Sequence, residues 1–311
     1  MTKLKEKSIL TQFDGIVLLD KPEGPTTAKC GREIARYLGN KVGHAGTLDP
    51  LATGLVILLI GRATKISRYL SGLDKTYTGR IFLGKKTDTG DSEGKIISEK
   101  PIEISEEKIR EIAPRMIGSH EQRPPAYSAV KHKGKALYKY ARQGIKVEVE
   151  PRTVSVDKFR IISVDSHGIA FEAEVSKGTY IRALAERFGE IAGCGAHLSE
   201  LRRTTIGSFS VENALSFEKI LLLAQKCELK NESITMSEAL GHLPEIAVDA
   251  EEAKRIAFGK LIDLDRIEIN ENGLFRITAE NELIAIARKT GDSKRHYKYE
   301  RVLITPEEIE N

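Results

Sequence analysis

One short segment carries the residue types that could do chemistry. It reads GHAGTLDPLATG, from Gly43 to Gly54, and its only ionisable carboxylate is Asp49. Pro50 biases the residue before it toward an extended backbone, and the glycines permit sharp turns and close approach to a ligand. A lone acid displayed in this way suits a nucleophile or a general base. By residue type alone, Asp49 suits an Asx-turn equally well, and a lone His44 suits a structural role.

Other catalytic patterns are missing from the sequence. It contains no phosphate-binding G-x-x-x-x-G-K-[ST] or G-x-G-x-x-G loop and no H-E-x-x-H zinc motif. The triplet Asp88–Gly90 resembles that of aspartic proteases, but no second copy exists, so we interpret it as a solvated turn. The three cysteines are far apart, which predicts reduced thiols rather than disulfides or a zinc site. We therefore expect neither a metal nor a cofactor.

The elements around this segment must position Asp49. Gly15–Lys21 and Leu55–Ile60 are continuous apolar runs, which predict strands buried on both faces. Thr26 or Thr27 can cap a helix that ends at Gly39. Further expected elements are a strand at Tyr77–Leu83, a helix from Ser105 with an apolar stripe to Ile117, strands at Arg152–Val164 and Ile169–Val175, and a helix at Thr179–Ala192. Their mixed order predicts an α+β fold with a large mixed sheet.

The C-terminal part of the chain has a different pattern. After Ser237–Pro244 the sequence predicts a helix at Ala250–Phe258 and short strands at Leu261–Leu264, Leu274–Ile277, Leu283–Ala287 and Arg301–Ile304. We expect a main domain over residues 1–236 and a small β-rich domain over residues 237–311, an acceptable domain size.

A basic, tyrosine-rich stretch runs from Tyr127 to Arg142, within a predicted insertion over about residues 124–150. It contains Lys131 and Lys133 among several cations, interleaved with tyrosines. Such a mixture suits a loop that grips RNA phosphates and bases, although a charged run is also typical of a solvated face. The net charge of +4 permits an RNA partner without requiring one.

No segment predicts a membrane or export role. The longest apolar run, Leu55–Ile60, is far shorter than the ~20 residues that span a bilayer. The N-terminal residues are charged and lack the apolar region of a signal peptide. We expect a cytoplasmic protein.

Five blocks together resemble the TruB family of pseudouridine synthases. In order, they are GIVLLDKPEGPTT, GHAGTLDPLATG, LDKTYTGRIFLGKKTDTGD, PPAYSAVKHKGKALYKYARQG and SKGTYIRALAERFGEIAGCGAHLSELRRTTIG, which together extend from Gly15 to Gly207. The resemblance implies a pseudouridine synthase fold with an RNA-binding cleft and a PUA-like C-terminal domain. It also implies isomerisation of uridine 55 in the T-loop of tRNA, without a cofactor or an obligatory protein partner, by a monomer.

The resemblance assigns roles to individual residues. It implies that Asp49 is the catalytic aspartate, that Arg182 is its partner and that Tyr77 stacks on the flipped uracil. It implies that His44 fills the gap left by the extruded base. Tyr180 and Leu201 match residues that line the uracil pocket, and Lys131 and Lys133 fall in a segment that closes over the T-loop. An arginine beside Asp49 is expected to keep that carboxylate ionised. Arg202 and Arg203 suit either phosphate contacts or an exposed helix end.

Two other functions fit the same motifs. A guide-RNA-dependent pseudouridine synthase subunit would share the catalytic loop, but the insertion and the Leu-Ala-Thr sequence after Pro50 favour the bacterial form. A tRNA-folding chaperone without chemistry would use the same cleft, but would not need Asp49, Tyr77 and Arg182. Activity of the isolated protein on naked tRNA distinguishes these alternatives.

Overall fold

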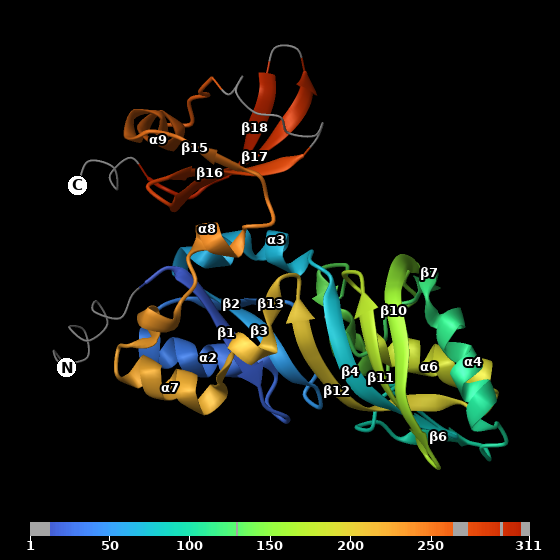
Figure 1. Ribbon diagram of the computed structural model, residues 1–311. Coiled ribbons are helices and arrows are strands. Elements are labelled where there is room, and N and C mark those ends of the chain that lie inside the picture. The colour runs from blue at the N-terminus through green and yellow to red at the C-terminus, as the bar shows by residue number, and fades with distance from the viewer. Residues whose placement is uncertain (1–12, 129, 264–272, 293–294, 306–311) are drawn as a thin grey trace.

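The protein is built on one large mixed sheet that carries a smaller unit at one end (Figure 1). The computed structural model describes residues 13–128, 130–263, 273–292 and 295–305. In the large sheet the strand order is β14-β1-β3-β12-β4-β11-β10-β7, with β2 paired to β3 and β13 to β12. Two of these pairs, β1 with β14 and β3 with β12, are parallel, whereas the others are antiparallel. The predicted α+β class with a large mixed sheet is therefore confirmed.

The strands of the large sheet are β1 (Gly15–Lys21), β2 (Val42–Ala45), β3 (Thr53–Ile60), β4 (Lys75–Leu83), β7 (Gly118–Gln122), β10 (Arg152–Asp165), β11 (Gly168–Val175), β12 (Ala196–Ile206), β13 (Phe209–Ser210) and β14 (Leu215–Ser216). Short hairpins are formed by β5 (Lys85–Thr87) with β6 (Ile96–Glu99) and by β8 (Lys131–His132) with β9 (Lys135–Ala136). The helices of this part are α2 (Thr27–Leu38), α3 (Ser67–Ser71), α4 (Glu106–Met116), α5 (Leu137–Ala141), α6 (Ile181–Ala192), α7 (Phe217–Gln225) and α8 (Met236–Ala239), with 3-10 turns η1 (Gly61–Ile66), η2 (Val211–Asn213) and η3 (Leu229–Glu232).

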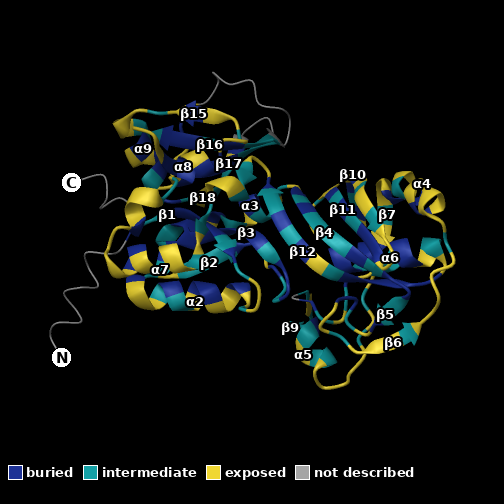
Figure 2. Cartoon of the chain, turned by 60° about the horizontal axis from the view of Figure 1, so that its bottom comes forward, coloured by how far each residue is buried: buried dark blue, intermediate teal, exposed yellow. Residues whose placement is uncertain are grey.

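Apolar side chains are buried on both faces of the sheet. On one face, residues of α2, α4, α6 and α7 pack with Val17, Val56 and Phe171 into the largest core cluster. On the opposite face, Ile16, Ile57 and neighbouring side chains pack against η1, α3 and α8. Figure 2 shows the resulting dark-blue, buried colouring along the central strands. β1 and β3 are buried on both faces, as their continuous apolar sequences predict.

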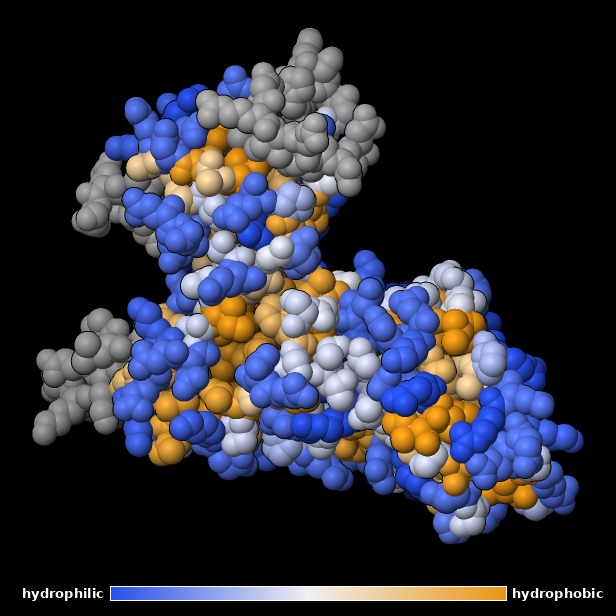
Figure 3. Space-filling model, viewed as in Figure 1, coloured by the Kyte–Doolittle hydropathy of each residue, from blue (hydrophilic) through white to orange (hydrophobic). Residues whose placement is uncertain are grey.

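The C-terminal unit has its own small sheet and core. Its strands are β15 (Glu245–Ala247), β16 (Leu274–Ala279), β17 (Glu282–Asp292) and β18 (Arg295–Val302), and its helix is α9 (Ala250–Ala257). Leu283, Ile286 and Leu303 extend the core cluster of the main sheet, and Arg68 forms an ion pair with Glu300 at 3.6 Å. The unit is therefore packed against the main body around η1, α3 and α8. Figure 3 shows hydrophilic residues over much of the visible surface of the main body.

Helix caps follow the sequence closely. Thr26 accepts a hydrogen bond from the backbone N–H of Lys29 at the start of α2, and Gly39 ends this helix in the left-handed conformation. Ser105 caps α4 in the same manner. Tyr180 lies at the cap of α6, so that helix begins two residues later than expected.

Several predictions of local structure are wrong. The segment Gly43–Gly54 is not a loop throughout, because Gly43 and His44 pair with β3. Ile117 follows α4 and is exposed rather than part of its buried stripe. Residues 261–263 form no strand, and Leu264 lies outside the described residues. Within the described ranges, none of the helices combines the length and apolar character that crossing a bilayer requires.

The largest omission is β12, which the sequence analysis did not predict. This strand lies between β3 and β4 in the middle of the sheet. Arg202 and Arg203 belong to β12 and not to a helix end, and Arg203 is only 1% exposed. Alternation of buried and intermediate residues along β12 is interrupted by two register shifts, which obscures the period-two pattern of a strand.

Candidate active site

The irregular part of the candidate catalytic segment, residues 46–52, is fixed by three buried side chains. Lys21 at the end of β1 donates hydrogen bonds to the carbonyl oxygens of Pro50 (3.2 Å) and Ala52 (2.7 Å). The Thr27 hydroxyl of α2 exchanges hydrogen bonds with the backbone N–H (2.9 Å) and carbonyl (3.1 Å) of Leu48. These contacts hold the backbone on both sides of Asp49.

Arg203 is the third of these side chains and acts from β12. Its Nη2 donates to the carbonyl of Gly46 at 3.0 Å, and its Nε donates to the carbonyl of Leu55 at 2.7 Å. Gly54 allows β3 to lie against this residue, since a Cβ at Gly54 would lie 2.3 Å from the Arg203 carbonyl oxygen and its φ is +100°. The catalytic segment is therefore tied to β1, α2 and β12 at once.

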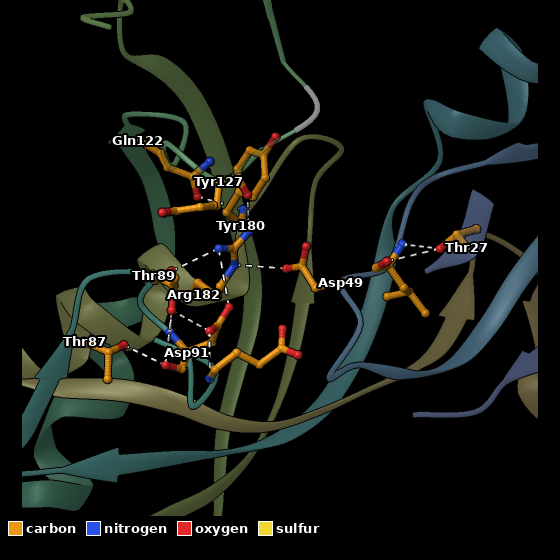
Figure 4. A network of polar contacts seen from close by, with 11 residues as sticks. Thr27, Asp49, Thr87, Thr89, Asp91, Gln122, Tyr127, Tyr180 and Arg182 are labelled. Atoms are coloured by element: carbon orange, nitrogen blue, oxygen red, sulfur yellow. Dashed lines mark hydrogen bonds and ion pairs between the residues drawn. The ribbon is translucent and has the colours of Figure 1, made fainter. Parts of the chain in front are cut away.

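Asp49 and Arg182 form an ion pair, as the resemblance implies. The Arg182 Nε lies 3.0 Å from the Asp49 Oδ2, and the arginine side chain is 4% exposed whereas the aspartate side chain is 36% exposed. Arg182 is held by the carbonyls of Thr89 (3.0 Å) and Tyr127 (2.8 Å), which accept from Nη1 and Nη2. Figure 4 shows the Arg182 guanidinium between Asp49 and Thr89, and the exposed fractions show that the carboxylate is more accessible than the guanidinium.

Asp91 is a second carboxylate beside Arg182. Its Oδ2 lies 3.5 Å from Nη1, and its Oδ1 accepts hydrogen bonds from the Thr89 hydroxyl at 2.6 Å and the Glu93 N–H at 3.1 Å. Asp91 is 3% exposed, whereas in the expected turn Asp88–Gly90 just before it Asp88 is exposed, Thr89 is half-buried and only Gly90 is buried. The sequence signal was weak, because an Asp-Thr-Gly-Asp run is also a common turn sequence.

Burial raises the pKa of Asp49 above its ordinary value, and the nearby Arg182 opposes this shift without overcoming it. The Asp91 charge raises the pKa of Asp49 further. Arg182 thus favours the ionised carboxylate, as expected, but its effect on the pKa is smaller than that of burial. Desolvation destabilises the charged carboxylate, and the arginine only partly compensates for that cost.

Asp49 lies where a cavity meets an open cleft. The cavity has a volume of about 260 Å³, and its wall includes Tyr77 from β4, Tyr180 and Arg182 around the start of α6, and Leu201 from β12. Tyr77 and Leu201 are buried and contribute to the main core cluster. The Tyr180 N–H donates to the Gln122 Oε1 at 2.8 Å, which ties the start of α6 to β7. The structure thus brings together four of the predicted site residues around Asp49.

The open cleft also borders Asp49 and has a volume of about 580 Å³. His44 lines this cleft together with Arg32, Tyr138 and Arg142. Burial lowers the pKa of His44, and the positive charge of Arg203 lowers it further, which favours the neutral imidazole. His44 is therefore separated from the cavity that holds Tyr77, but it shares the cleft with the carboxylate.

Only part of the basic stretch reaches the site. Tyr127 and Tyr138 line the cleft, and the Tyr127 carbonyl accepts from Arg182. Lys131 and Lys133 are exposed and do not line the cavity or the cleft. In Figure 2 the region of β9 and α5 projects beyond the sheet, coloured mainly as intermediate or exposed.

Three residues were missed as parts of the site: Asp91, Lys21 and Thr27. Lys21 occurs in the apolar run of β1, where a charged residue at full burial is unusual and is itself a signal. Thr27 was considered only as a helix cap, a role that Thr26 performs. In the described part of the chain, no three His, Cys, Asp or Glu side chains gather into a group that could hold a metal ion.

Comparison with known proteins identifies the family. The model of the TruB family pseudouridylate synthase N-terminal domain matches residues 33–181, and that of the tRNA pseudouridylate synthase B C-terminal domain matches residues 182–243. A protein of Aromatoleum aromaticum named tRNA pseudouridine synthase B is 41% identical over 90% of both chains. One of the same name from Mannheimia succiniciproducens is 37% identical over 88% of this chain and 91% of its own. The chain belongs to the TruB family of pseudouridine synthases.

Solved structures agree with the fold. A chain of the archaeal box H/ACA sRNP Nop10-Cbf5 complex matches with a TM-score of 0.72 at 23% identity, covering 97% of this chain and 89% of its own. A chain of a Cbf5-Nop10-Gar1 complex matches with the same TM-score at 24% identity, covering 98% and 88%. At this identity the similarity concerns the fold alone.

Proposed function

We propose that this protein converts uridine to pseudouridine in tRNA, at position 55 of the T-loop. The observation that carries the proposal is the ion pair of Asp49 with Arg182, placed where a base-sized cavity opens into a cleft. Relatives named tRNA pseudouridine synthase B, which match about nine tenths of the chain, support tRNA as the substrate. The T-loop position follows from the resemblance to the family.

The reaction requires a base that has left the RNA stack. The target uracil enters the cavity, where the ring of Tyr77 provides a flat surface and Leu201 and Tyr180 enclose it. Stacking on an aromatic ring contributes ~1–3 kcal/mol per base. His44, in the cleft outside, is positioned to fill the space that the extruded base leaves. Its neutral form suits packing between bases.

Asp49 performs the covalent or basic step. Its carboxylate attacks the ribose or the base, or takes a proton, while the N1–C1′ bond breaks and a C5–C1′ bond forms. Arg182 and the fixed backbone hold the carboxylate in one orientation, which saves the entropy of aligning it during the reaction. Substrate and product are isomers, so the chemistry calls for no redox cofactor, and we propose that none is needed.

We infer the following domain organisation and mode of action. Residues 1–236 form the catalytic domain, with an RNA-gripping insertion over about residues 124–150, and residues 237–311 form a PUA-like domain. The separate core cluster around Phe275 and Tyr297 supports a C-terminal domain of its own. We propose that the protein acts on the T-arm as a monomer in the cytoplasm, without a protein partner.

Site-resolved mapping of pseudouridine tests the proposal. A tRNA transcript incubated with the purified protein alone should carry pseudouridine at position 55, and treatment with EDTA in monovalent salt should leave the yield unchanged. A transcript with position 55 changed to cytidine is the matched control. Modification that needs an added guide RNA would favour the guide-dependent alternative. Refolding of tRNA without any pseudouridine would favour the chaperone alternative.

A further inference from the structure

The cavity beside Asp49 contains a second charged group with no assigned role. Lys75 lies at the start of β4, two residues before Tyr77, so both side chains project from the same face of the sheet. Lys75 lines the cavity and is 7% exposed. A nearly buried cation in a base-sized cavity needs an explanation, since burying an unpaired charge is costly.

The ammonium group of Lys75 is held in place, but only part of its hydrogen-bonding capacity is used. Its Nζ donates hydrogen bonds to the carbonyl of Ser71 at 3.0 Å and to the carbonyl of Leu73. An ammonium group has three N–H donors, so one donor is left for a ligand. Among the described residues, no carboxylate forms a salt bridge with Lys75. Lys75 therefore has no ion-pair partner among these residues, although the charge of Asp74 raises its pKa.

The charges around the cavity fall into two groups. Asp49 is influenced by Arg182, Asp91 and Lys21. Lys75 is influenced by Arg203, Asp74 and Lys177, and burial and the two cations lower the pKa of Lys75 to about 8. The group around Asp49 thus contains the anionic nucleophile. The group around Lys75 has more positive than negative charges.

The positive charge around Lys75 complements a negative charge that forms on the uracil during the reaction. This inference rests on the proposed function. When the N1–C1′ bond breaks, its electron pair remains on the uracil, whose negative charge is shared by N1 and the carbonyl oxygens. The pair is used again when C5 bonds to C1′, and the C5 proton is then lost while N1 gains a proton. Only an interaction that strengthens as the base becomes anionic accelerates the cleavage.

We propose that Lys75 is a catalytic residue that donates its free N–H to the uracil and stabilises the negative charge of the departing base. Arg203 adds positive potential next to it, while its Nη2 and Nε donate to the carbonyls of Gly46 and Leu55. The rival role, contact with an RNA phosphate, fits less well, because Lys75 lies within the cavity wall beside the base-stacking Tyr77.

Single-turnover kinetics at saturating tRNA test the role of the charge. Lys75→Met keeps the length of the side chain but removes the charge, and the rate should fall about 10²- to 10³-fold, as when one oxyanion donor is lost. The dissociation constant for tRNA should stay within about 3-fold, which also shows that the variant is folded. Lys75→Arg should restore most of the rate. An unchanged rate in Lys75→Met would overturn the proposal, as would a loss confined to affinity with a flatter salt dependence, which marks a phosphate contact.

The pH profile gives a readout that a purely structural lysine would not affect. The wild-type rate should decline as pH rises through about 8, because Lys75 loses its proton there, whereas Lys75→Arg should not show this decline. Ionisation of the substrate base is common to both proteins. Lys177 repels Lys75 without lining the cavity, so Lys177→Met should shift the decline to higher pH and leave the rate at neutral pH unchanged. Identical profiles for wild type and Lys75→Arg would refute the role. Wild-type formation of pseudouridine in the same assay tests the proposed function separately.

Discussion

The catalytic segment at residues 46–52 and the basic stretch Tyr127–Arg142 are held in opposite ways. The first is anchored by buried side chains from β1, α2 and β12, which are distant in sequence. The second is stabilised mainly within itself, by the β8–β9 hairpin and by cation–π contacts such as Lys135 over Tyr140 at 4.5 Å. A reacting carboxylate must be placed to a fraction of an ångström, whereas a surface that follows an RNA backbone can adapt. The contrast predicts that mutations in the two regions affect different steps.

Loosening the anchored segment should have the largest effect. Lys21→Met leaves the buried carbonyl of Ala52 and the partly buried carbonyls of Pro22 and Pro50 without their donor. We expect each carbonyl left without a donor to lower the free energy of unfolding by up to about 1–3 kcal/mol. We expect turnover to fall about 10²-fold, because Asp49 is then misplaced. Denaturant melts and single-turnover rates measure both, with Lys226→Met on the exposed end of α7 as the control. Full activity in Lys21→Met would show that the anchoring is dispensable.

Altering the electrostatics of the site should have an intermediate effect. The negative charge of Asp91 raises the pKa of Asp49, so Asp91→Asn should lower that pKa and move the acidic limb of the rate profile to lower pH. The sign follows because Asp49 is active as a carboxylate and gains activity as pH rises through its pKa. The plateau rate should fall about 10- to 100-fold, the range for losing a hydrogen bond to a charged group. An acidic limb that stays in place would separate Asp91 from the titration of Asp49.

Changes in the basic stretch should have the smallest effect on turnover. Lys131→Ala combined with Lys133→Ala removes two exposed cations that we propose to contact phosphates. The slope of log K against log salt should flatten by about one to two units, at about 0.7 per phosphate contact. The rate at saturating tRNA should change far less than the affinity.

The matched control for this pair is Lys219→Ala combined with Lys226→Ala, an equal loss of charge at exposed positions of α7 and its C-cap. If the salt slope changes equally in both double variants, the basic stretch contributes only its charge and makes no specific phosphate contacts. A large loss of turnover at saturating tRNA would contradict the division of roles between the two regions.

Local signals made the framework predictable from sequence. The apolar runs of β1 and β3 and the caps Thr26 and Gly39 depend on neighbouring residues only, and each lies where expected. β12 was missed because its register shifts break the alternation of its side chains. Asp91 was missed because its partner Arg182 is far away along the chain, and only the fold brings the two together.

The residues of the site were predictable from the resemblance, whereas the electrostatics of Asp49 were not. Grouping Asp49, Tyr77, Tyr180, Arg182 and Leu201 followed from the family blocks, and the structure places all five around one cavity. The direction of the Asp49 pKa shift was not predictable from the pair alone. It depends on how deeply the carboxylate is buried, which a sequence does not specify.

The central claim is that the Asp49 carboxylate carries out the isomerisation in an otherwise complete binding site. Asp49→Asn keeps the shape of the side chain but removes its charge, so tRNA affinity should remain within a few-fold of wild type. Release of tritium from C5-labelled uridine in tRNA, which reports loss of the C5 hydrogen, should then be undetectable. Substantial tritium release by Asp49→Asn would contradict the account, because the chemistry would have to come from another group.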